Sequence, residues 1–98
     1  MADTLQVTCI NKRDRQSPHE RISHIGGVVD GKRWRLSEDT AISGIKTDKY
    51  KFYVSAVING QRKSVWVIVA IHLNREYLKT EADGLIPDNL LSLPECQS

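Results

Sequence analysis

The sequence lacks any apolar run of the roughly 18 residues that a membrane-spanning helix requires, and we expect no membrane partner. We also expect no secretory signal, because the start of the sequence, Met1–Thr4, has neither a basic segment nor an apolar one. Both absences predict a cytoplasmic protein. Since the cytoplasm is reducing, the two cysteines, Cys9 and Cys96, are expected to be thiols rather than a disulfide.

Motifs for catalysis and for cofactors are missing as well. No Gly-rich run opens a helix, as a phosphate loop does, and no serine or cysteine has the local pattern of an activated nucleophile. His19 and Glu20 begin like a zinc-protease motif, but His24 lies five residues after His19, which rotates it by about 140° around a helix. The two histidines would therefore not share one face. We expect no enzyme activity and no cofactor.

The composition is that of one ordinary globular domain. The chain has 98 residues, of which 40% are hydrophobic and 27% are charged. This length supports one hydrophobic core, so a single domain is expected over residues 1–98. The net charge of +2 is unevenly distributed, because residues 1–35 carry seven Lys and Arg against four Asp and Glu, whereas residues 76–98 carry one against five. A basic body could bind a polyanion, or the two surfaces could neutralise each other.

Alternating apolar and polar residues predict strands along most of the chain. The expected strands cover residues 5–10, 21–25, 32–36, 50–58, 64–73 and 76–80. Asp30-Gly31 and Asn59-Gly60 are typical of two-residue hairpin turns, and Gly26-Gly27 indicates a bulge or a turn. Residues 65–73 are almost continuously apolar, which predicts a central strand that is covered on both faces.

One helix is expected, at about residues 38–46. Ser37 is a good N-cap, and Glu38 and Asp39 place negative charge in the first turn, where the helix dipole favours it. Three leucines in residues 89–93 predict that the C-terminal tail docks on the body. The expected fold is α+β: an antiparallel sheet of five or six strands, with the short helix between the third and fourth strands and the tail docked.

Basic residues form the main candidate site. They lie in the first loop, on the second strand and on the hairpin that follows it: Lys12, Arg13, Arg15, Arg21, Lys32, Arg33 and Arg35. If the first three strands pair consecutively, these side chains gather at one edge of the sheet and can contact phosphates. Tyr53 and Trp66, on the outward side of their strands, could stack on bases. Charged residues on outward strand positions are also what an ordinary solvated sheet requires, and this simpler alternative carries more weight. Among specific functions, we expect binding of a nucleic acid or another polyanion.

Two other functions remain open. Cys9, His19, His24 and Cys96 are zinc-ligand types that a docked tail could bring together. The ordinary alternative is a buried Cys9 and a hydrogen-bonded His24, and a Cys9–Cys96 disulfide is a third possibility. The small size and the apolar strands also fit a protein-interaction or structural accessory domain, including a homodimer that forms through a sheet edge.

Several motifs resemble those of a small bacterial family that is catalogued as a domain of unknown function. These motifs are Cys9-Ile10-Asn11-Lys12, Pro18-His19-Glu20-Arg21-Ile22-x-His24-Ile25-Gly26-Gly27, Trp34-x-Leu36-Ser37, Phe52-Tyr53-Val54, Tyr77-Leu78-Lys79-Thr80 and Asn89-Leu90-Leu91-Ser92-Leu93-Pro94-Glu95-Cys96. The resemblance covers nearly the whole chain. It implies a bacterial, cytoplasmic, single-domain protein and assigns neither an activity nor site residues.

Overall fold

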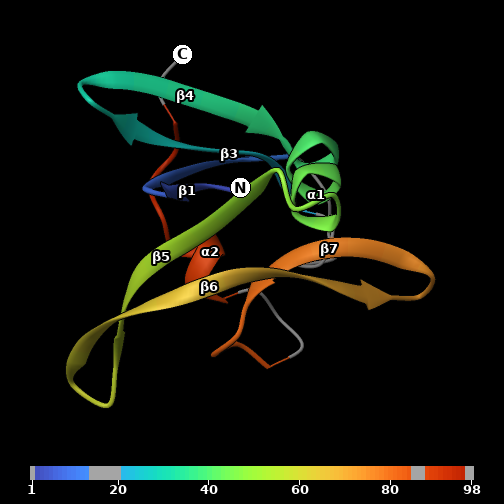
Figure 1. The fold of residues 1–98 in the computed structure, drawn as a ribbon. Helices are drawn as coiled ribbons and strands as arrows, with labels where there is room; N and C mark the ends of the chain where they lie inside the picture. The colour runs from blue at the N-terminus through green and yellow to red at the C-terminus, as the bar shows by residue number, and fades with distance from the viewer. Residues whose placement is uncertain (1, 14–20, 85–87, 97–98) are drawn as a thin grey trace.

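The computed structural model describes residues 2–13, 21–84 and 88–96 (Figure 1). In this part of the chain the elements are β1 (Asp3–Gln6), β2 (Cys9–Lys12), β3 (Ile22–Val29), β4 (Lys32–Ser37), α1 (Glu38–Lys46), β5 (Tyr50–Ile58), β6 (Gln61–His72), β7 (Arg75–Thr80) and α2 (Asp88–Leu91). The α+β class and the short helix at residues 38–46 are confirmed. Neither of these two helices is long and apolar enough to cross a membrane.

The strands form two sheets rather than the single antiparallel sheet that was expected. One sheet has the order β1-β5-β6-β7, and the other has the order β2-β3-β4. The β1–β5 pair is parallel, so the first sheet is mixed. The expected strand over residues 5–10 is divided, because the N–H of Val7 donates to Tyr53 O whereas the N–H of Thr8 donates to Gly26 O. The N-terminal segment thus changes partner at this point and joins the two sheets (Figure 1).

The double glycine at residues 26–27 lies inside β3, so the expected bulge or turn there is wrong. A Cβ atom on Gly26 would stand 2.7 Å from Trp34 O and 2.9 Å from Cys96 Sγ, and one on Gly27 would overlap Gln6 O. Glycine is required at both positions because other parts of the chain approach the backbone closely. The irregularity in this sheet lies instead between Asn11 and Lys12 on β2.

Helix α1 begins as the sequence predicts. The Oγ of Ser37 accepts a hydrogen bond from the N–H of Thr40 at 3.2 Å, which satisfies one of the free donors of the first turn. Its apolar side contacts both sheets, and the buried core that results contains Val7, Ile10, Ile22, Ile25, Ala41, Ile42, Phe52, Val54, Val67, Leu78 and Leu90. Both sheets, α1 and α2 contribute to this one core, so the described residues form a single packed unit.

The C-terminal tail docks on the body as predicted. Leu90 of α2 is completely buried, and Leu91 and Leu93 pack against the core. The second cover expected for β6 is absent from the described part of the chain. β6 does lie between β5 and β7, but Trp66, on the face opposite to the core residues Val65 and Val67, is 43% exposed. The apolar run therefore marks a central strand of which one face meets water.

Candidate functional site

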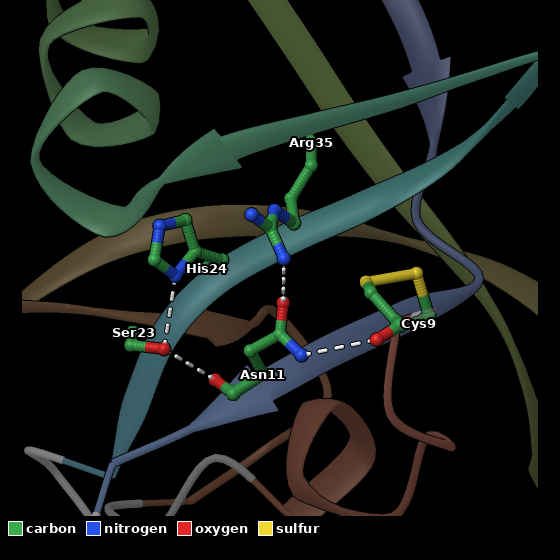
Figure 2. Close-up of a disulfide and its surroundings, with 6 residues drawn as sticks. Cys9, Asn11, Ser23, His24 and Arg35 are labelled. Atoms are coloured by element: carbon green, nitrogen blue, oxygen red, sulfur yellow. Dashed lines mark hydrogen bonds between the residues drawn. A yellow bond between two sulfur atoms is a disulfide. The ribbon is translucent and has the colours of Figure 1, made fainter. Parts of the chain in front are cut away.

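Cys9 and Cys96 form a disulfide that ties the end of the tail to β2 (Figure 2). The N–H of Ile10 donates to Pro94 O at 2.9 Å, and the N–H of Cys96 donates to Ile10 O at 3.0 Å. These backbone bonds place the two Cα atoms 4.9 Å apart, which is within the range for a disulfide. The expectation of two thiols is therefore wrong. It rested on the presumed compartment, whereas the pairing depends on how the tail docks.

A metal site built from Cys9, His19, His24 and Cys96 is not supported. Zinc binds the thiolate form of cysteine, and the disulfide occupies both sulfur atoms. His24 hydrogen-bonds Ser23 through Nδ1 at 3.0 Å, and His19 lies outside the described residues. Residues 2–13, 21–84 and 88–96 contain no cluster of three or more His, Cys, Asp or Glu that could hold a metal.

The outer face of the β2-β3-β4 sheet, which is the side that points away from the core, carries a polar network (Figure 2). Arg35 Nη1 donates to Asn11 Oδ1 at 3.3 Å, and Asn11 Nδ2 donates to Cys96 O at 3.2 Å. Ser23 Oγ donates to the backbone oxygen of Asn11 at 3.1 Å. Asn11 thus connects an arginine of β4 to the disulfide-bonded tail.

This network depends on the glycine at position 26. The strand register pairs Gly26 with Cys9 on one side and with Arg35 on the other. Side chains that are opposite each other in a sheet share a face, so the middle of this row carries no side chain. Arg35 can therefore lie across β3 and reach Asn11 on β2, as Figure 2 shows.

A groove of about 670 Å³ follows the same face. The disulfide, Pro94 and Glu95 line one side of it, and Arg33 and Arg35 line the other. β3 lies between these two sides and contributes Gly27 and Val28. Both arginines are exposed. The groove therefore combines two guanidinium groups with a floor that is partly bare backbone, an arrangement that can hold an anion. We call it the tail groove.

The seven basic residues of the predicted site are not gathered in one place. Arg33 and Arg35 share the outer face of β4. Lys32, the first residue of β4, points to the opposite face because side chains alternate along a strand. Arg13 instead forms an ion pair with Glu38, at 3.9 Å between Nη2 and Oε1, and the Glu38 side chain is only 2% exposed. Lys12 and Arg21 are exposed outside the groove lining, and Arg15 lies outside the described residues. Of the six that the structure describes, Arg33 and Arg35 line the groove.

The aromatic pair that was expected to stack bases lies on the other sheet. Tyr53 of β5 and Trp66 of β6 are directly opposite each other, with ring centroids 6.2 Å apart in an edge-on arrangement. The Nζ of Lys51 lies 5.8 Å from the centre of the Trp66 ring and makes a cation–π contact. A base would have to displace Lys51 from this ring before stacking on it. The pair therefore does not extend the tail groove.

Sequence reasoning missed the roles of two uncharged polar residues, Thr8 and Asn11. Thr8 lines the groove where β1 gives way to β2, and Asn11 fixes Arg35. Two motifs could have indicated this site: Cys9–Lys12 and Gly26-Gly27, which are separate in the sequence but lie on paired strands. Two consecutive glycines beside a cysteine indicate that another segment approaches the backbone closely. The sequence does not show that this segment is the C-terminal tail.

Comparison with known proteins gives a family without a function. Neither the curated proteins nor the solved structures include a match to this chain. A family model described as "Protein of unknown function (DUF3892)" matches residues 6–94, from the end of β1 to the part of the tail that binds Ile10. This span includes nearly all of the groove lining, although it stops two residues before Cys96. The chain therefore belongs to the DUF3892 family, as the resemblance in its motifs indicated.

Proposed function

We propose that this protein binds a nucleic acid or another polyanion along the tail groove, with Arg33 and Arg35 as the main contacts. One observation carries the proposal: the two arginines are exposed on the same face of β4 and line the same groove. Guanidinium groups match phosphate oxygens in geometry and can bind them through two parallel hydrogen bonds.

The surroundings of Arg35 support this role. Its bond to Asn11 uses Nη1, and a guanidinium has further N–H groups that can donate to a phosphate. Because Asn11 holds the side chain in place, less conformational entropy is lost when the ligand binds.

The test is binding of fluorescently labelled single-stranded DNA, single-stranded RNA and heparin to the oxidised protein, measured by anisotropy over a range of salt concentrations. We expect the variant Arg33→Gln, Arg35→Gln to bind at least about tenfold more weakly, since hydrogen bonds to charged groups contribute roughly 1.5–3 kcal/mol each. Loss of two phosphate contacts should also reduce the slope of log affinity against log salt by about 1.4 for a single strand.

A matched control is Arg62→Gln, Lys63→Gln at the β5–β6 hairpin, which removes the same charge far along the other sheet. It should keep most of the affinity. Equal losses in both variants would show a general effect of net charge rather than a site. If the parent protein does not bind any of the three probes at low salt, the proposal is wrong.

A separate feature favours the second candidate function, which is binding to another protein, with formation of a homodimer as one form of it. At the tip of the β6–β7 hairpin, Leu73 is 87% exposed and its φ is 52°, in the left-handed region. This conformation costs a leucine roughly 1–2 kcal/mol, and a strained, exposed apolar residue is more often found at a contact surface. Sedimentation at high concentration tests it: a dimer is expected for the parent and a monomer for Leu73→Asn. A monomeric parent would exclude the homodimer.

The remaining expectations from the sequence concern what the chain does in the cell. A cytoplasmic location, the lack of a cofactor and the lack of an enzyme activity stay predictions, and so does the absence of a membrane partner.

A further inference from the structure

The Cys9–Cys96 disulfide lies at the surface of the groove rather than in the core. Both cysteines line the groove and are half-buried, whereas their neighbour Ile10 is fully buried on the opposite face. A Cβ atom on Gly26 would stand 2.9 Å from Cys96 Sγ and 3.1 Å from Cys9 Sγ, so the sulfurs lie over this glycine on the outer face. A small molecule in the groove can therefore reach the disulfide.

The positive groups of the groove are positioned beside this disulfide. Arg35 binds Asn11, and Asn11 in turn binds the backbone oxygen of Cys96 (Figure 2). Arg33 lies two residues along the same strand and lines the same groove. Nearby arginines favour the thiolate form of cysteine, which is both the leaving group and the product of disulfide reduction. They also attract an attacking thiol that carries carboxylates.

Opening the disulfide does not require the tail to leave the core. Leu90 and Leu93 hold the tail upstream of the cysteine, and Leu90 is fully buried. Beyond Leu93, the disulfide is accompanied by the two backbone hydrogen bonds of Ile10 and the contact from Asn11. Reduction would thus release only the last residues from the edge of β2.

We propose that the Cys9–Cys96 disulfide is an exchange site for a small thiol that carries carboxylate groups, and that Arg33 and Arg35 bind these carboxylates. The thiolate attacks one sulfur of the disulfide, a mixed disulfide forms, and the other cysteine leaves as a thiolate. A second small thiol attacks the mixed disulfide. Two small thiols thereby give up two electrons and become one disulfide, and the protein gains two thiols, which take up the two protons.

This inference goes beyond binding of a polyanion, although it uses the same two arginines. It is tested in the absence of nucleic acid, by measuring the rate of disulfide reduction with three probes: glutathione, which is an anionic thiol, 2-mercaptoethanol, which is neutral, and cysteamine, which is cationic. Rates are compared per concentration of thiolate. We expect glutathione to react at least about tenfold faster than 2-mercaptoethanol with the parent protein, which reverses the order expected from size.

The variant Arg33→Gln, Arg35→Gln should lose this preference for glutathione, and its rate with 2-mercaptoethanol should change little. The matched control, Arg62→Gln, Lys63→Gln, should keep the preference. The same preference in both variants would overturn the proposal. A rate that depends on neither the identity nor the concentration of the thiol would also overturn it, because reduction would then wait for unfolding. Polyanion binding is measured separately on oxidised protein, so either proposal can fail without the other.

Discussion

The two sheets present different surfaces to water. The outer face of β2-β3-β4 carries a fixed polar network: a disulfide and three side-chain hydrogen bonds connect β2, β3, β4 and the tail. Large apolar side chains are exposed on both sheets, but more so on β1-β5-β6-β7: Val57 at 65% and Ile71 at 71%, against Val28 at 54% and Val29 at 40% at the β3–β4 hairpin. The same core supports both faces, so the difference does not come from how well the two sheets are buried.

This difference favours the outer face of the smaller sheet as the place where the proposed ligand binds. A charged ligand must be met by polar groups in defined positions, because each loosely held side chain loses entropy on binding. Arg35, held by Asn11, is such a group and lines the tail groove, whereas Arg62 of the larger sheet, held by Ser55, does not line it. An apolar contact surface needs less fixed geometry, and the exposed hairpins of the larger sheet have that character.

The largest effect is expected from loss of the disulfide. It joins residues separated by 87 positions, and the loop-closure argument gives about 4–5 kcal/mol as its contribution to the free energy of unfolding. Urea denaturation of the oxidised and reduced protein should differ by an amount approaching this value, and Cys9→Ser, Cys96→Ser should match the reduced form. A difference below about 1 kcal/mol would mean that the smaller sheet does not depend on the cross-link.

A smaller effect is expected for Gly26→Ala. The new methyl group would meet Trp34 O at 2.7 Å and both sulfur atoms within about 3 Å, so the strand or the disulfide must move. Overpacking of this kind costs about 1–3 kcal/mol. Gly84→Ala is the control, because nothing lies within 4 Å of the added atom there. If thermal denaturation shows the same stability for both variants, the glycine row does not hold the smaller sheet together.

Local features of the fold were predictable because they depend on neighbouring residues. Asp30-Gly31 and Asn59-Gly60 do form the two-residue turns, with positive φ at all four positions, and Ser37 does cap α1. The bend after Val7 was not predictable. The alternation of residues 5–10 is the same whether the segment pairs with one strand or with two, and its partners come from distant parts of the chain.

The candidate site was predictable only in its charges. Alternation along β4 places Arg33 and Arg35 on one face, as expected. The ion pair between Arg13 and Glu38 could not be foreseen, because these residues come together only when the chain folds and α1 packs against the sheets. The disulfide and the groove depend on the tail, whose docking brings residues from opposite ends of the chain together. Local glycine patterns likewise do not distinguish a turn from a close approach by another segment.

A gain in stability of about 1 kcal/mol is expected for Leu73→Asn. Asn tolerates the left-handed conformation that this turn requires, whereas leucine is strained there. Leu73→Ala is the comparison, since it removes the apolar side chain and keeps the strain. Chemical denaturation should place Asn above Ala by roughly 0.5–1 kcal/mol. If the two variants are equally stable, the left-handed backbone at residue 73 does not destabilise this hairpin, and strain is not a property that separates the larger sheet from the smaller one.

The smallest effect is expected at Glu95, the one acidic side chain among the described residues that line the groove. It lies on the side opposite the arginines and repels an anionic ligand, so Glu95→Gln should strengthen polyanion binding by about twofold to fivefold, the range of exposed charge pairs. Glu81→Gln, in the turn directly after β7, removes the same charge and keeps an acceptor for the N–H of Trp66, which donates to Glu81 Oε1 at 3.2 Å. Anisotropy titrations should show little change for that variant. An equal gain in affinity for both variants would mean that the ligand responds to the overall charge of the protein. A gain confined to Glu95→Gln would mean that the ligand binds in the tail groove.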